Sequence, residues 1–294
     1  GGTALQVQFP QARWVLWLFV LALAAVAALR IATPWGWHAL ALGAAVVGGW
    51  YLTLTPRLDR DWAPDVARIV TSDIAGPVVT LRDVRDFHWR DRDHATERWR
   101  DMVVNLDQLQ SADMITSVWS SPKIAHLLVS FGFADGQRVV FSVEIRRERA
   151  EAFSSIGGFF RQFELALIAA TEEDIVKLRT NHRAEDVRLY PLRLTPEQLR
   201  PVFLAYLDLG NHLARKPEFY NTVTSNCTTV VWQLVRVLKP DLPLHRSLLL
   251  SGLLPDWLYQ LDVLDGDGDL ETLREAARIT DMANTAPEGA DYST

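Results

Sequence analysis

Ser225-Asn226-Cys227-Thr228-Thr229 contains the only cysteine among the 294 residues of the chain. Cys227 therefore has no partner for a disulfide and no thiolate neighbours for a metal cluster. Apolar residues follow at spacings of three and four and stop before Pro240, which predicts a buried amphipathic helix. These residues are Val230, Val231, Trp232, Leu234, Val235 and Leu238. Ser225 or Asn226 suits the N-cap, which puts Cys227 in the first turn.

A cysteine in the first turn of a helix is a candidate nucleophile. The helix dipole and the free backbone N–H groups there favour the thiolate over the thiol. The alternative is a small apolar side chain packed under the helix, because free cysteines are usually buried and inert. A histidine and a carboxylate about a hundred residues upstream favour the first interpretation.

Charge is unevenly distributed along the chain. Residues 1–56 contain no Asp or Glu and two basic residues, Arg13 and Arg30, so residues 57–294 carry 28 basic and 36 acidic residues, a net charge of −8 (28 − 36). An acidic soluble part argues against nucleic acid as a partner. The length suits one or two domains with a full core.

Two apolar runs, residues 14–31 and 35–54, precede the acidic part. Each is long enough to cross a hydrocarbon core of about 30 Å, and tryptophans cluster towards the run ends, as in an interfacial belt. Small residues at 44, 45, 48 and 49 allow close helix packing. The runs predict a transmembrane hairpin rather than two buried helices of a soluble core. The turn at Thr33-Pro34 puts both hairpin ends on one side of the membrane, but Arg13 and Arg30 roughly cancel and leave the orientation open.

We divide the chain into a transmembrane helical hairpin (12–55), a juxtamembrane mixed-charge connector (56–112), a catalytic domain (113–270) and a C-terminal helix with a mobile tail (271–294). The connector is either a solvated, ion-paired surface or a platform for phosphate headgroups. His88 and His94 lack further ligands at a useful spacing, so we expect no metal. The segment 265–269 lacks the Gly and Glu of a calcium loop and reads as a turn before a short helix.

Residues 124–133 and 137–145 alternate like strands, with the loop Ala134-Asp135-Gly136 between them. A three-residue loop with Gly in the left-handed position predicts a hairpin. The register that pairs apolar residues on one face sets Leu128 opposite Ser142 and His126 opposite Glu144. A carboxylate there would orient the imidazole and stabilise its cation. The alternative is a surface cross-strand pair contributing about 0.2–1 kcal/mol.

The combination of Cys227, His126 and Glu144 is more specific than any one of them. A thiolate–imidazolium pair with backbone donors at a helix N-terminus supplies nucleophile, base and oxyanion stabilisation. The order His, Glu, Cys is that of a circularly permuted papain-like fold, in which the nucleophile helix follows the strands. We therefore expect an α+β domain with an antiparallel sheet.

Several motifs in this order resemble the Lnb family of bacterial lipoprotein N-acyltransferases. They are Arg85-Asp86-Phe87, residues 125–131, residues 142–147, Asp174 with Leu178-Arg179-Thr180, Tyr190-Pro191-Leu192, Phe219-Tyr220-Asn221 and Asn226-Cys227-Thr228. The resemblance covers about residues 80 to 265. It implies a multi-pass protein of the bacterial inner membrane whose papain-like domain faces the periplasm. The implied reaction moves a fatty acyl chain from a membrane phospholipid to the N-terminal amine of a diacylated lipoprotein, with no cofactor.

The resemblance also implies residue roles. Cys227 is the nucleophile, His126 the general base and Glu144 the residue that orients the histidine. Four residues line the approach to the nucleophile, and one of them completes an oxyanion hole: Tyr220, Asn221, Asn226 and Thr228. Arg146, Arg147 and Arg179 are candidates for binding the phospholipid headgroup or for structural pairs with Asp174.

An acyl-enzyme must be kept from water, so we expect an apolar groove near the bilayer. Its candidate lining is Phe153, Ile156, Phe159, Phe160, Phe163 and residues 248–254, with core packing as the alternative. Two other functions stay open. One is a cysteine hydrolase of the same fold, either a phospholipase or a peptidoglycan amidase, and the other is a non-catalytic membrane-binding module.

Overall fold

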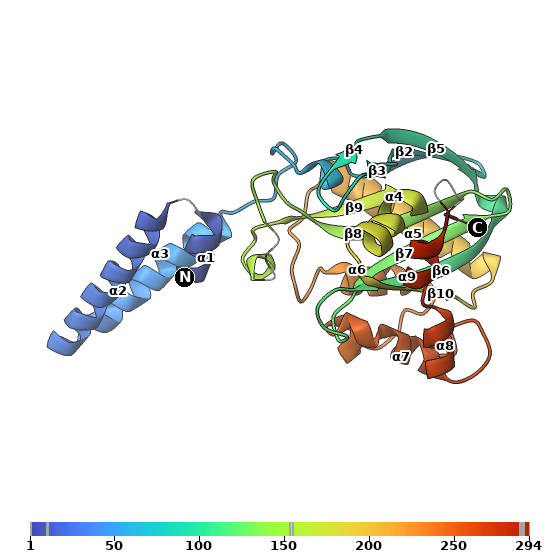
Figure 1. Cartoon of the computed structure of the whole chain (residues 1–294). Helices are drawn as coiled ribbons and strands as arrows, with labels where there is room; N and C mark the ends of the chain where they lie inside the picture. Colours follow the sequence, from blue (N-terminus) through green and yellow to red (C-terminus); the bar gives the residue numbers. More distant parts are fainter. Residues whose placement is uncertain (1, 10–11, 153, 155, 288–291, 294) are drawn as a thin grey trace.

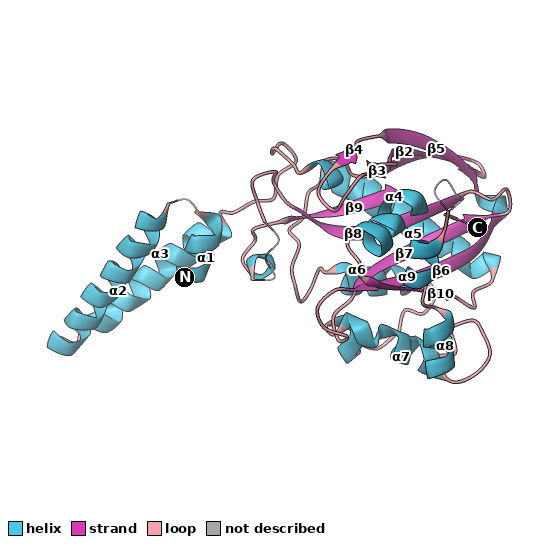
Figure 2. Cartoon of the chain, viewed as in Figure 1, coloured by secondary structure: helices cyan, strands magenta, loops and turns pink. Residues whose placement is uncertain are grey.

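The computed structural model describes residues 2–9, 12–152, 154, 156–287 and 292–293. Three helices form an extension at the N-terminal end, and an α+β domain follows (Figure 1). In the domain, helices cover both faces of one large sheet (Figure 2).

The helices of the extension are α1 (Gly2–Gln8), α2 (Arg13–Ala32) and α3 (Gly36–Leu52). Those of the domain are α4 (Glu172–Lys177), α5 (Pro196–Arg215), α6 (Cys227–Val235), α7 (Leu254–Gln260), α8 (Leu270–Ala276) and α9 (Thr280–Thr285). Short 3-10 helices are η1 (Pro64–Val66), η2 (Leu106–Gln108), η3 (Gly157–Phe159), η5 (Arg246–Leu248) and η6 (Ser251–Leu253), and η4 (Leu178–His182) is a π-helical turn. The strands are β1 (Thr71–Ala75), β2 (Val78–Arg85), β3 (His88–Trp89), β4 (Ala95–Thr96), β5 (Trp99–Asn105), β6 (Leu109–Val118), β7 (His126–Phe133), β8 (Arg138–Arg146), β9 (Glu164–Ala170) and β10 (Asp186–Pro191).

The main sheet has the order β1-β2-β9-β8-β7-β6-β10, with β5 paired to β2. All its pairs are antiparallel except β2 with β9, which meet in parallel at Arg85 and Ala170. The expected antiparallel sheet is therefore a mixed one. Strands β1, β2 and β5 come from the segment 56–112, which we expected to be a connector but which contributes buried side chains such as Leu81 and Val104 to the main core. The division into domains stays a prediction.

A cluster of aromatic rings forms where α5 packs on the sheet. Phe203 of α5 meets Phe131 of β7 edge to face at 5.1 Å between ring centroids, and Tyr206 stacks on Phe141 of β8 at 4.9 Å. All four rings are buried. Truncating one such ring typically costs about 3–5 kcal/mol, so this cluster fixes the central strands that carry the candidate site.

The β7–β8 hairpin has the expected register. Leu128 pairs with Ser142, Val129 with Phe141, and the turn closes through Gly136, whose φ is +85°. A side chain at this angle would be strained, which explains the glycine. Both strands are buried on both faces over most of their length, so the hairpin lies inside the domain rather than on its surface.

Helices α2 and α3 lie side by side and run away from the domain and back (Figure 1). The window Trp14–Ala32 is long and apolar enough to cross a membrane, with a mean hydropathy of 2.5 and none of it buried. It is the one such helix in the described part of the chain, since α3 has 17 residues. A signal sequence near an N-terminus has the same properties, so the hairpin as a two-helix membrane anchor stays a prediction.

The C-terminal segment contains the expected short helix, α8, with Asp269 as its N-cap. Further on, the hydroxyl of Tyr292 hydrogen-bonds to that of Thr180 in η4. This part of the expected mobile tail is thus attached to the domain, and residues 288–291 and 294 lie outside the described residues.

Candidate active site

Cys227 is the first residue of α6, as the sequence predicts. The side-chain oxygen of Asn226 accepts the backbone N–H groups of Thr228 and Thr229 at 2.9 and 2.8 Å, which makes Asn226 the N-cap. The backbone N–H of Cys227 itself has no acceptor among the described residues. A free donor at the positive end of a helix is suited to an anion beside the sulfur.

His126 is the first residue of β7 and lies beside both the thiol and a carboxylate. Its Nε2 is 2.8 Å from Ser142 Oγ and 3.1 Å from Glu144 Oε1, both on β8. Cys227 lies close enough to the imidazole for the two groups to shift each other's pKa, and the backbone N–H of Leu127 also favours the thiolate form of Cys227. The hairpin register and the helix N-terminus thus bring together the three predicted catalytic residues.

The charges of these groups stabilise one another. Burial alone would lower the pKa of His126, but the Glu144 carboxylate and the hydrogen bonds to Cys227 and Glu144 outweigh it and raise this pKa to about 9. Burial would likewise raise the pKa of Cys227, yet the hydrogen bond and positive charge of His126 lower it below its usual value. The site therefore favours a thiolate–imidazolium pair over a neutral thiol and imidazole.

Glu144 is held in turn by two side chains. Arg179 of η4 donates from Nη2 to Glu144 Oε1 at 3.2 Å, and Ser142 donates from Oγ to the same oxygen at 2.7 Å. Burial would raise the pKa of Glu144, but the charge of His126, their hydrogen bond and the charge of Arg179 keep it well below its usual range. The sequence reasoning missed Ser142 as a site residue. Its position two residues before Glu144 on the same strand face was the available signal.

None of the three arginines proposed for headgroups pairs with Asp174, so that structural alternative is wrong. Arg179 binds Glu144, while Arg146 is buried over the Trp62 ring and donates to the carbonyls of Val66 and Ala67. Arg147 pairs with Asp65 at 2.9 Å. The partner of Asp174 is Arg85, at 2.7 Å. A role of these arginines toward headgroups stays a prediction. Arg146 and Arg179 are buried, and Arg147 is half-buried.

The residues expected along the approach divide into two kinds. Asn226 is occupied as the cap, and its Nδ2 donates to the carbonyls of Thr222 and Leu248. Asn221 accepts two backbone N–H groups of the following turn. Thr228 and Tyr220, by contrast, interact with Cys227. The Thr228 hydroxyl is 3.8 Å from Sγ, and burial together with the negative charge of Cys227 raises the pKa of Tyr220.

The expected apolar lining is partly core and partly surface. Phe163, Leu248 and Leu254 are buried, and the cluster that contains Leu248 and Leu254 also packs against Cys227. Ile156, Phe159 and Leu249 are exposed. Phe153 lies outside the described residues.

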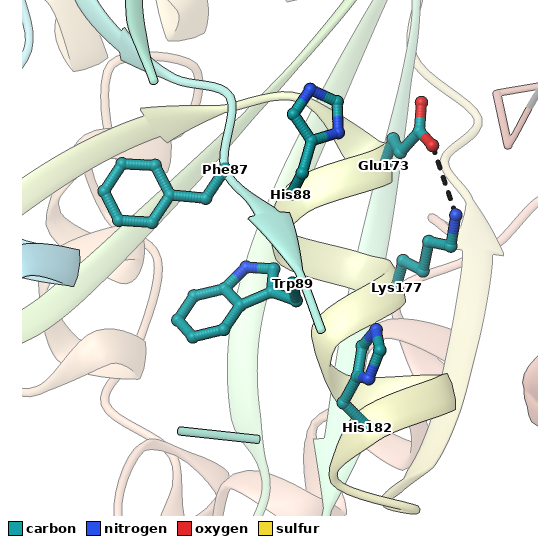
Figure 3. A pocket seen from close by; sticks show the side chains of 6 residues that line it. All are labelled: Phe87, His88, Trp89, Glu173, Lys177 and His182. Atoms are coloured by element: carbon teal, nitrogen blue, oxygen red, sulfur yellow. Dashed lines mark hydrogen bonds and ion pairs between the residues drawn. The ribbon is translucent and has the colours of Figure 1, made fainter. Parts of the chain in front are cut away.

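Two cavities lie elsewhere. One of about 50 Å³ between β3 and the α4–η4 segment is shown in Figure 3, where Lys177 pairs with Glu173 and His88 and His182 face the pocket. The other, of about 930 Å³, reaches Arg138, Glu172 and α9. No predicted catalytic residue lines either one. Within the described ranges no three His, Cys, Asp or Glu side chains are grouped to hold a metal ion.

An α+β domain in which a helix-terminal cysteine meets a histidine–carboxylate pair has the arrangement that thiol-dependent acyl-transfer enzymes use. The model of one protein family, described as the Lnb N-terminal periplasmic domain, matches residues 95–262, more than half of the chain. The chain belongs to this family, which confirms the identification made from its motifs. No curated protein and no solved structure matches it.

Proposed function

We propose that this protein is a membrane-anchored, cysteine-dependent acyltransferase that moves a fatty acyl chain from a phospholipid to the N-terminal amine of a diacylglyceryl-cysteine lipoprotein. Membership of the Lnb family supports a role in lipoprotein biogenesis. The single observation that carries the proposal is the placement of Cys227, the first residue of α6, beside His126, whose Nε2 lies 3.1 Å from Glu144 Oε1. This arrangement provides a nucleophile, a proton carrier and an orienting charge.

In the first half of the reaction, the Cys227 thiolate attacks an ester carbonyl carbon of the phospholipid. The carbonyl oxygen becomes an oxyanion that the free N–H of Cys227 is positioned to stabilise. When the intermediate collapses, the carbon–oxygen ester bond breaks and the imidazolium of His126 gives its proton to the leaving alkoxide. Lysophospholipid departs, and the acyl chain remains on sulfur as a thioester.

In the second half, the α-amine of the lipoprotein's diacylglyceryl-cysteine attacks the thioester carbonyl. His126, now neutral, accepts the proton that the amine loses as the amide forms. The carbon–sulfur bond breaks, and the thiolate–imidazolium pair is restored. Glu144 and Arg179 keep the imidazole in place throughout, because they fix the side of the ring that faces away from the sulfur.

We further propose that helices α2 and α3 anchor the protein in the inner membrane as a two-pass hairpin, with the domain in the periplasm. The apolar, exposed window of α2 and the periplasmic description of the family support this topology. The sequence order of His126, Glu144 and Cys227, with the nucleophile helix after the strands, supports a circularly permuted papain-like domain.

Incubating the full-length protein with phosphatidylethanolamine and phosphatidylglycerol vesicles and a diacylated lipopeptide tests the proposal. N-acyl lipopeptide with an equal amount of lysophospholipid, and an acyl adduct on Cys227 by intact mass, are expected. Release of free fatty acid alone would instead identify a phospholipase. No reaction would favour a membrane-binding module, and cleavage of peptidoglycan fragments would favour an amidase.

A further inference from the structure

The segment 156–161 is attached to the domain-facing end of the helical extension. Gln8 of α1 donates from Nε2 to the carbonyls of Phe160 and Arg161 at 3.0 and 2.9 Å. Arg161 donates back to the carbonyls of Tyr51 and Leu54, both at 3.2 Å, and its guanidinium lies 4.8 Å from the Tyr51 ring centroid. The segment is therefore fixed against the point where α3 ends.

That end of the extension is also rich in aromatic side chains. Trp14 and Trp17 begin the candidate membrane window and are exposed, and Trp50 lies near the end of α3. Aromatic rings at the end of an apolar helix mark the headgroup level of a bilayer. The Tyr51 hydroxyl reaches the carbonyl of Phe159 at 3.4 Å, so η3 lies at the same depth as this belt.

Two apolar side chains of the segment are unusually exposed for their size. Ile156 is 58% and Phe159 45% exposed. Single exposed apolar residues need no explanation, but these two belong to a segment that is hydrogen-bonded to the end of α3, beside the candidate membrane window and its exposed apolar side chains. Arg161 beside them suits the phosphate level of a lipid headgroup.

The segment also contacts the chain that leads to the nucleophile. The backbone N–H of Thr222 donates to the carbonyl of Gly158 at 3.4 Å. The approach is close, because a Cβ added at Gly158 would overlap Thr222 Oγ1 and lie 3.2 Å from the Tyr220 ring. The carbonyl of Thr222 in turn accepts Asn226 Nδ2 at 2.8 Å, one residue before Cys227.

We infer that the segment 156–161 is an interfacial loop that inserts Ile156 and Phe159 into the outer leaflet facing the domain and delivers the acyl chain of a bilayer phospholipid to Cys227. This inference rests on the proposed function for the acyl donor, while the insertion itself rests on the contacts with α1 and α3. The loop lets the site draw its donor from a membrane without moving the domain.

Insertion is tested with a fluorophore. In the full chain carrying Cys227→Ser, an environment-sensitive dye is attached at Phe159→Cys or, as a matched control, at Val103→Cys. Val103 is 55% exposed on β5, away from the helical extension (Figure 1). After reconstitution in phosphatidylethanolamine and phosphatidylglycerol vesicles, brominated lipids should quench the dye at 159 at least threefold more than at 103. Equal quenching at both positions overturns the inference.

Delivery is tested by the rate of acyl-Cys227 formation. Ile156→Ser with Phe159→Ser should slow acylation from vesicle phospholipid at least tenfold and change acylation from a water-soluble short-chain phospholipid by less than twofold. Val103→Ser should change neither rate. Equal loss with both donors would overturn the delivery role. If the wild type is acylated by neither donor, the proposed function fails, and the quenching result still decides whether the loop inserts.

Discussion

Two arginine–carboxylate pairs of this domain, Arg85 with Asp174 and Arg179 with Glu144, differ in one respect. Asp174 accepts Arg85 Nε and Nη2 at 2.7 and 3.0 Å, the backbone N–H of Phe87 at 3.0 Å and Trp89 Nε1 at 2.7 Å. None of these donors releases a proton near neutral pH. The pair joins β2 and β3 to α4, and its donors keep a single protonation state near neutral pH.

Glu144 also has an arginine partner, Arg179, but it shares its carboxylate with His126, which does titrate. The imidazole passes this influence on to Cys227. Burial and ion pairing alone therefore do not distinguish a structural carboxylate from a site carboxylate. The distinguishing feature is the third partner, a group that can gain and lose a proton next to a nucleophile.

The largest loss of activity should come from removing Cys227 or His126, the two residues to which the Glu144–Arg179 pair is connected and the Asp174–Arg85 pair is not. Cys227→Ala and His126→Ala should each lower lipopeptide acylation by at least about 10³-fold, because nucleophile and base act as one unit. Their free energies of unfolding should stay within about 1 kcal/mol of wild type, measured by chemical denaturation. Activity within tenfold of wild type in either variant would contradict the assigned roles.

Breaking the Arg85–Asp174 pair should lower the stability of the fold. Asp174→Asn leaves the buried charge of Arg85 without its counter-charge, so the free energy of unfolding should fall by about 3–5 kcal/mol. Asp73→Asn is the matched control, since Asp73 pairs with Arg82 on the exposed surface and should cost less than about 1 kcal/mol. Equal losses in urea titrations of the two variants would remove the contrast between buried and exposed pairs.

The sequence predicts those parts of the site that depend on local pattern. The cap at Asn226, the start of α6 at Cys227 and the β7–β8 register each follow from a few neighbouring residues. A glycine in the turn and alternating apolar residues suffice for the register. Consequently the positions of His126 and Glu144 relative to each other are readable without a structure.

Partner choice among charged residues is not readable in this way. Arg179 and Glu144 are 35 positions apart, and Arg85 and Asp174 are 89 apart. Which arginine meets which carboxylate depends on how α4 and η4 pack on the sheet, and periodicity carries no such information. The same limit explains why the segment 56–112 was predicted to be a connector. Its many charged residues hid the alternating apolar residues Val79 and Leu81, which are buried in the core.

Removing only the charge of Glu144 should have an intermediate effect. Glu144→Gln keeps the shape but loses the attraction that raises the pKa of His126 to about 9. Activity should fall about 10²-fold. In the wild type, His126 loses its proton as the pH rises through about 9, and activity falls with it. In the variant, this alkaline fall in the pH profile of activity should occur at a lower pH. The pH dependence of acylation and of Cys227 alkylation checks both, and an alkaline fall at an unchanged pH would contradict the orienting role.

The smallest effect should come from Ser142, whose hydroxyl bridges His126 Nε2 and Glu144. Ser142→Ala removes both of these hydrogen bonds, each worth about 0.5–1.5 kcal/mol. Because Glu144 still contacts His126 directly at 3.1 Å, we expect only a roughly two- to tenfold loss of acylation rate. Ser130→Ala is the matched control, because Ser130 is equally buried and donates to a carboxylate, Glu172, at 2.6 Å, remote from the thiol. Both variants should lose similar stability, whereas only Ser142→Ala should lose activity. Equal activities would show that the hydroxyl contributes packing alone, and that Glu144 positions the imidazole without it.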